Sequence, residues 1–73
     1  MEERVLEILR NILEQEDIDE SCSQTTCEKW DSMNHLNLVI ELESEFGISL
    51  EPEEIGQMQS YNDIIRVLKT KVS

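Results

Sequence analysis

The stretch that decides the fold is DSMNHLNLVIELESEFG, residues 31–47 of a chain of 73 residues. Its apolar residues recur at intervals of three and four, which is typical of an α-helix and not of a strand. Asp31 and Ser32 are both good N-cap residues, and Gly47 readily adopts the left-handed conformation that ends many helices. We therefore predict a helix that runs from Ser32 to Phe46.

The apolar surface of this predicted helix is wider than a bundle helix requires. With about 100° of rotation per residue, the apolar residues span an arc of about 220°, whereas a surface helix buries a stripe of little more than about 100°. The arc consists of Met33, Leu36, Leu38, Val39, Ile40, Leu42 and Phe46. Two explanations stay open: the other helices clasp this one from two sides, or one edge of the arc faces a docking partner or lines an apolar cleft.

The residues before this helix divide into another predicted helix and a long loop. Val5, Ile8 and Ile12 repeat at helical spacing, so we predict a helix over residues 2–16. Residues 17–31 lose that period and are rich in Ser, Thr, Asp and Cys, which predicts a loop. Long loops in compact domains are often functional.

The residues after Gly47 predict two more helices. Residues 48–50 form a short extended link, Pro52 suits the first turn of a short helix, and Ser60 is a good N-cap for a last helix. No strand-like alternation appears in the sequence. The expected fold class is all-α: one domain over residues 1–73, built as a small four-helix bundle of three main helices and one short helix.

The charge of the chain is strongly negative and uneven. Six Lys and Arg oppose 17 Asp and Glu, which gives a formal net charge of −11. Between residues 11 and 65, fourteen acidic residues meet a single base, Lys29. Such a field repels phosphate backbones and anionic lipids, so we expect no nucleic acid or membrane partner and a basic protein surface instead. A chain this short also lacks the bulk to enclose a deep active site.

The sequence gives no indication of export or membrane insertion. Residues 1–4 are acidic where a signal peptide is basic, and the longest apolar run, residues 38–40, is far below the roughly 20 residues that span a bilayer. Cys22 and Cys27 are too few for the disulfide framework of a small secreted protein. We expect a cytoplasmic protein with reduced thiols, while a disulfide between the two stays open.

The central stretch resembles the acyl carrier protein family. The family pattern is Asp-Ser-Leu followed by an apolar, acidic helix, and here it reads Trp30-Asp31-Ser32-Met33 before the helix and Leu42-Glu43-Ser44-Glu45-Phe46-Gly47 at its end. The likeness continues through Ile48-Ser49-Leu50 and the Pro52-Glu53-Glu54 helix to the last helix. It covers essentially the whole chain at the right length.

The resemblance implies a covalent carrier that is not itself an enzyme. In such proteins the serine that matches Ser32, next to Asp31, receives 4′-phosphopantetheine from coenzyme A through a phosphopantetheinyl transferase. The terminal thiol of that arm then holds acyl groups as thioesters and moves them between enzymes with basic docking patches. The resemblance also implies a monomer and no bound metal. The matching partner-binding positions are Met33, Leu36, Asn37, Ile40, Glu43 and Ser44, and the positions that line the core or an acyl cleft are Leu38, Val39, Leu42 and Phe46.

Some positions depart from the family pattern. Met33 replaces the usual leucine, and Asn34, Asn37 and Ser44 stand where carriers of fatty-acid synthesis are often acidic. The reduced docking charge indicates a specialised partner, so fatty-acid, polyketide and related pathways all stay open. An aminoacyl or peptidyl carrier is an alternative, less favoured because those carriers usually have His in place of Asp31. An unmodified acidic adaptor that binds a basic protein is another alternative.

Other groupings in the sequence are weaker. The acidic residues between Asp17 and Glu28 follow a calcium-loop spacing, but Cys22 occupies the position of the required glycine. The two cysteines lack partners for a zinc site. Ser32 and His35 are near enough in sequence to touch, but nothing in the sequence supplies an oxyanion hole. Phosphorylation of Ser32 by a kinase is a further alternative.

Overall fold

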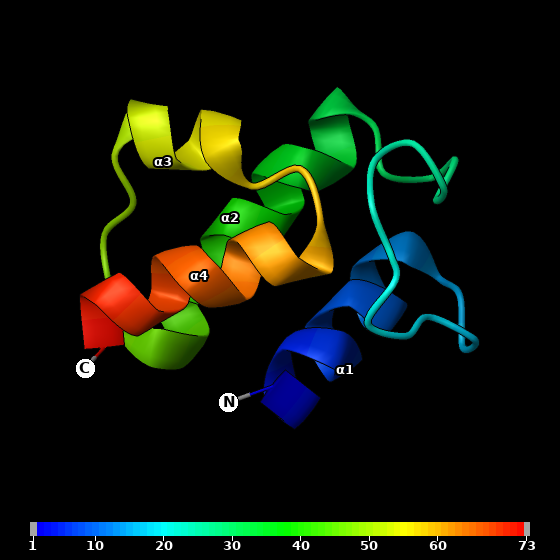
Figure 1. The fold of residues 1–73 in the computed structure, drawn as a ribbon, viewed down its shortest axis with the longest axis horizontal. Coiled ribbons are helices and arrows are strands. Elements are labelled where there is room, and N and C mark those ends of the chain that lie inside the picture. Colours follow the sequence, from blue (N-terminus) through cyan, green and yellow to red (C-terminus); the bar gives the residue numbers. More distant parts are fainter. Residues whose placement is uncertain (1, 73) are drawn as a thin grey trace.

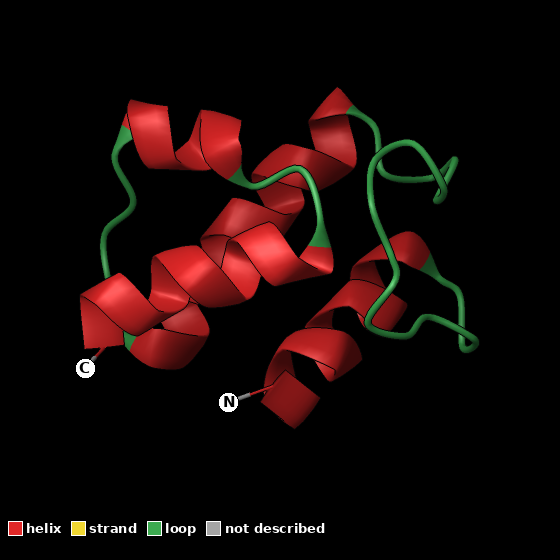
Figure 2. Cartoon of the chain, viewed as in Figure 1, coloured by secondary structure: helices red, strands yellow, loops and turns green. Residues whose placement is uncertain are grey.

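The computed structural model describes residues 2–72 and places four helices in that range (Figure 1). They are α1 (Glu2–Leu13), α2 (Ser32–Phe46), α3 (Pro52–Gln57) and α4 (Tyr61–Val72). Loops connect the helices, and the described residues form no strand (Figure 2). The predicted fold class, an all-α bundle of three main helices and one short helix, is confirmed.

The first helix is three residues shorter than predicted. We expected it to reach residue 16, but it ends at Leu13 because Glu14 takes a left-handed conformation with φ of 53°. The N–H of Gln15 then reaches back to the C=O of Arg10 at 3.1 Å, which satisfies a carbonyl at the end of the helix. Glutamate is uncommon in this left-handed conformation, so no residue type at position 14 marks the end of the helix.

The predicted ends of α2 are confirmed. Asp31 is the N-cap, and its carboxylate accepts a 2.8 Å hydrogen bond from the N–H of Asn34. At the other end Gly47 has φ of 62°, and its N–H donates to the C=O of Glu43. Similarly, the hydroxyl of Ser60 accepts from the N–H of Asp63 at 3.1 Å, as a cap of α4 does.

The core is aliphatic and shared by the main helices. Helix α1 packs against both α2 and α4. The largest fully buried side chains are Val5, Leu9, Leu13, Leu38, Leu42, Met58, Ile64 and Leu68. No helix among the described residues is long and apolar enough to cross a bilayer.

The long loop between α1 and α2 contributes to the core, which its polar composition did not indicate. Ile18, Cys22, Cys27 and Trp30 are each less than 10% exposed. Two backbone hydrogen bonds of 2.9 Å also join this loop to the connection between α3 and α4, one from Gln24 N–H to the C=O of Gln59 and one from the N–H of Tyr61 to the C=O of Cys22. The loop is therefore fixed to the body of the bundle beside the start of α2.

Candidate functional site

Ser32 is the first residue of α2, and its side chain is exposed. The preceding residue Asp31 caps the helix, so the serine lies where backbone N–H groups and the helix dipole create a positive potential. An anionic group attached to this hydroxyl would be stabilised there. The helix therefore begins at Ser32, as the sequence predicts.

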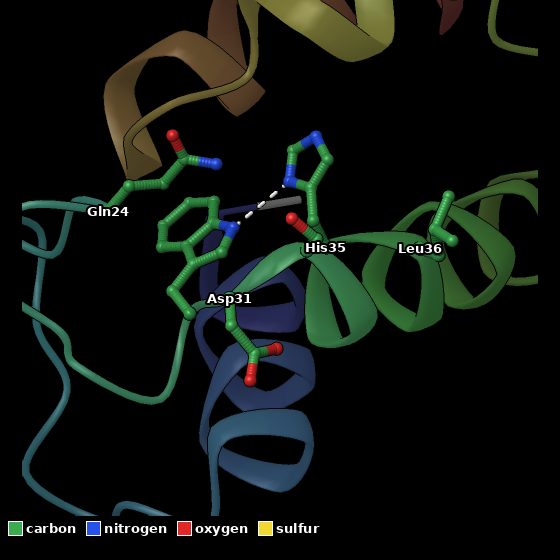
Figure 3. A pocket seen from close by; sticks show the side chains of 6 residues that line it. Gln24, Asp31, His35 and Leu36 are labelled. Carbon is green, nitrogen blue, oxygen red and sulfur yellow. Dashed lines mark hydrogen bonds between the residues drawn. The ribbon is translucent and has the colours of Figure 1, made fainter.

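A hollow of about 520 Å³ opens beside Ser32 (Figure 3). The loop supplies one part of its wall and the first two turns of α2 supply the other. Its lining residues are Gln24, Trp30, Asp31, Ser32, His35 and Leu36. The loop residue Gln24 was not singled out in the sequence, because no local pattern shows that residues 24 and 32 come together.

His35 is held by hydrogen bonds at both ring nitrogens. The indole Nε1–H of Trp30 donates to Nδ1 at 3.0 Å, as the dashed line in Figure 3 marks, and Nε2 lies 2.8 Å from the C=O of Ile55. Because an indole N–H can only donate and a carbonyl can only accept, Nδ1 is unprotonated and Nε2 bears the proton. Both nitrogens are therefore engaged with partners other than Ser32, which removes the basis for a Ser32–His35 catalytic pair.

The wide apolar arc of α2 is divided between the core and the surface. Leu38, Val39 and Leu42 are at most 6% exposed, and Phe46 is half-buried against the same core. The opposite edge is open: Met33 is 74% exposed, Leu36 60% and Ile40 62%. The structure therefore supports the second explanation of the wide arc, in which one edge is not covered by the other helices.

The predicted partner residues do not all lie in the same environment. Asn37 and Ser44 are exposed together with the open edge. Glu43 differs, because it is half-buried and its carboxylate accepts a 2.8 Å hydrogen bond from the N–H of Leu50. The Glu43 carboxylate therefore stabilises the link between α2 and α3 through this hydrogen bond.

The charge on α2 is further reduced by an ion pair. Glu45 lies 2.8 Å from the guanidinium of Arg4 on α1, and this contact lowers the pKa of the glutamate. Glu41 is exposed on the same helix. Beside the open edge, the exposed positions Ser32, Asn37 and Ser44 are uncharged, in contrast to the negative charge of the chain as a whole.

The acidic loop does not gather into a metal site. Within residues 2–72, no group of three or more His, Cys, Asp or Glu side chains is arranged to hold a metal ion. Asp19 instead accepts hydrogen bonds from the N–H and the hydroxyl of Ser21, at 2.9 and 2.6 Å, and these bonds lower its pKa. The calcium-loop spacing in the sequence corresponds to a turn closed by side chains.

Comparison with known proteins finds a solved structure with a similar fold. No protein-family model matches the sequence. The structure superimposes on that of a putative acyl carrier protein from Mycobacterium tuberculosis with a TM-score of 0.82 at 21% sequence identity. The match covers 94% of this chain and 95% of the other. The chain therefore has the four-helix fold of that protein over nearly the whole length of both.

Proposed function

We propose that this chain is an acyl carrier protein whose Ser32 is the attachment site of 4′-phosphopantetheine. The observation that favours this most is the place of Ser32: an exposed hydroxyl at the first residue of a capped helix, within the fold of a carrier-like protein. The Oγ atom would form a phosphodiester with the phosphopantetheinyl part of coenzyme A. The arm, when attached, supplies a thiol that holds acyl groups as thioesters.

The residues around Ser32 fit an attached phosphate. The first turn of α2 provides positive potential, and the carboxylate of Asp31 is engaged by the N–H of Asn34, at 2.8 Å. Both predicted cofactor residues thus have separate tasks: Ser32 presents the hydroxyl, and Asp31 fixes the start of the helix beneath it. His35 stabilises the wall of the hollow beside Ser32 through its hydrogen bonds with Trp30 and Ile55.

The open edge of α2 is the proposed docking surface for partner enzymes. Met33, Leu36 and Ile40 lie at helical spacing next to Ser32, so an enzyme that covers them also reaches the serine. The charge of −11 would speed the approach to a basic patch, whereas burial of the exposed apolar side chains would hold the complex. The partners are a phosphopantetheinyl transferase and acyl-processing enzymes of a fatty-acid, polyketide or related specialised pathway, and the carrier itself is a cytoplasmic monomer without catalysis of its own.

An intact-mass assay tests the proposal. The purified protein is incubated with coenzyme A, Mg²⁺ and a broad-specificity transferase, and its mass should rise by one phosphopantetheinyl group. The Ser32→Ala variant should show no gain while its circular dichroism stays helical. If several transferases leave the helical wild-type protein unmodified, the carrier function is wrong and an unmodified adaptor becomes the better explanation.

A further inference from the structure

We propose that Cys22 and Cys27 are a redox-active pair that forms a reversible disulfide in the loop beside Ser32. The two Sγ atoms are in contact at 2.6 Å, and the side chains are 3% and 7% exposed. Neither thiol takes part in the proposed carrier function, so this inference is independent of it. Because the two buried sulfur atoms already touch, a disulfide bond can form between them without a rearrangement of the fold.

The backbone of the loop brings the two cysteines together. The N–H of Cys27 donates to the C=O of Ser23 at 2.9 Å, and the N–H of Thr26 donates to the same carbonyl at 3.2 Å. On the other side, the N–H of Cys22 donates to the C=O of Asp19 at 3.1 Å. A hydrogen-bonded turn therefore closes the five-residue separation, and the sulfur contact does not depend on side-chain rotation alone.

The chemistry assigns different tasks to the two thiols. Burial raises the pKa of Cys22, and the hydrogen bond with Cys27 adds to this effect. Cys27 is the more exposed of the two, at 7% against 3%, and the hydroxyl of Thr26 lies 3.9 Å from its sulfur, so we assign the attack on the oxidant to Cys27 and the resolution of the intermediate to Cys22. Once Cys27 is bonded to another sulfur, its contribution to the raised pKa of Cys22 disappears. Both cysteines line a hollow of about 180 Å³ at the surface of the loop.

The oxidant that we propose is a small disulfide such as oxidised glutathione. The Cys27 thiolate attacks one of its sulfur atoms, the glutathione S–S bond breaks, and one glutathione leaves as a thiol with the proton of Cys27. The Cys22 thiolate then attacks the Cys27 sulfur and releases the second glutathione, which takes the proton of Cys22. The two cysteines lose two protons and two electrons, which together are two hydrogen atoms, and one glutathione disulfide becomes two thiols.

Oxidation would stiffen one wall of the hollow next to Ser32. The C=O of Cys22 accepts a hydrogen bond from the N–H of Tyr61 at 2.9 Å, and the C=O of Cys27 accepts one from the N–H of Trp30 at 3.0 Å. Trp30 and the intervening Gln24 both line that hollow. A covalent bond across this turn consequently restrains the segment that forms the wall.

Equilibration in glutathione buffers tests the disulfide directly. Samples are quenched with acid, their remaining thiols are alkylated, and the intact mass of the protein is measured. The folded monomer should lose two hydrogens, and its disulfide should be at least about tenfold more stable than in the same chain unfolded in urea, because folding holds the thiols together. Mixed disulfides on both cysteines, dimers, or equal stability in the folded and unfolded chains would overturn the proposal.

Two matched variants test the order of attack. Cys22→Ser should accumulate a single glutathione on Cys27, since the resolving thiol is absent, and Cys27→Ser should react at least about tenfold more slowly. The reverse order of reactivity would contradict the assignment of tasks. Trp30 is the sole tryptophan, so its fluorescence should change with the same midpoint as the loss of two hydrogens. An unchanged emission while the disulfide forms would show that the loop wall is not restrained.

Discussion

Trp30 and His35 form a hydrogen bond of 3.0 Å from the indole Nε1–H to Nδ1 of the imidazole. Their rings are also near-parallel, with centroids 6.2 Å apart and an interplanar angle of 26°. Through the second ring nitrogen, His35 reaches the C=O of Ile55 on α3 at 2.8 Å. One neutral imidazole therefore ties the end of the loop and the short helix α3 to the first turn of α2, next to Ser32.

A double-mutant cycle should measure the contribution of the Trp30–His35 hydrogen bond to stability. Trp30→Phe keeps an aromatic ring but removes the donor, and His35→Ala removes the acceptor and leaves the buried indole N–H unpaired. We expect each change to lower the free energy of unfolding by about 1–3 kcal/mol, with a coupling of about 1 kcal/mol between them. Urea denaturation checks this result, and strictly additive losses would show that the hydrogen bond contributes nothing.

Because the apolar arc is divided between core and surface, two residues of α2 that lie two positions apart should contribute very differently to the free energy of unfolding. Leu42 is fully buried and Ile40 is 62% exposed. Leu42→Ala should cost about 2–5 kcal/mol of unfolding free energy, whereas Ile40→Ala should stay within about 0.5 kcal/mol of the wild type. Urea denaturation of both variants checks this, and an equally large loss for Ile40→Ala would mean that the edge is covered.

The same open edge should govern binding to the transferase. Replacing Leu36 with serine removes an apolar contact next to Ser32 without affecting the core, so KM should rise by about tenfold or more while the fold is unchanged. Glu41→Gln, an exposed change on the same helix, serves as the control for charge. If Leu36→Ser leaves KM as it was and Glu41→Gln raises it, docking depends on charge and not on the apolar edge.

The Arg4–Glu45 ion pair predicts a small, pH-dependent contribution to stability. Arg4 lowers the pKa of Glu45 below its usual 4.5, so the native state binds that proton less readily than the unfolded chain does. The stabilisation is therefore present above about pH 4.5 and is lost as the pH falls through the lowered value. Glu45→Gln should be less stable than the wild type at neutral pH and equal to it in acid. A difference that persists in acid or in molar salt would contradict an electrostatic origin.

The hydroxyl of Tyr61 is a buried group without a hydrogen-bond partner among the described residues. Burial, with the charge of Glu20 nearby, raises the pKa of this phenol, so the hydroxyl stays neutral. Tyr61→Phe should therefore keep or increase the free energy of unfolding, by up to about 1 kcal/mol. A loss of more than about 1 kcal/mol in urea denaturation would show that the hydroxyl has a partner after all.

The sequence predicted those parts of the fold that depend on local signals. Asp31 and Gly47 determine the two ends of α2 through contacts within five residues, and both predictions are confirmed. The end of α1 was predicted too late because the left-handed conformation of Glu14 has no characteristic residue type. The tie from His35 to Ile55 spans 20 residues, and no local pattern could reveal it.

The candidate site was predictable in its centre and not in its surroundings. Ser32 and the apolar arc follow from the sequence, but only tertiary packing decides which edge of the arc is buried. Trp30 and Gln24 reach the hollow because the loop is bonded to residues 59–61, far along the chain. A loop without periodicity gives no indication of such contacts, since its conformation depends on the bundle that it covers.

The attachment of the arm to Ser32 is the central claim, and a side-by-side comparison of two variants tests it most directly. Ser32→Ala and Ser44→Ala differ in the position of one exposed hydroxyl on the same helix. Each variant is incubated in its own reaction with coenzyme A, Mg²⁺ and the same limiting amount of transferase, since the two variants have the same mass, and the intact mass in each reaction is followed with time. We predict that Ser44→Ala gains one phosphopantetheinyl group while Ser32→Ala gains none. Equal gain by both variants, or gain by neither alongside a modified control carrier, would contradict the account.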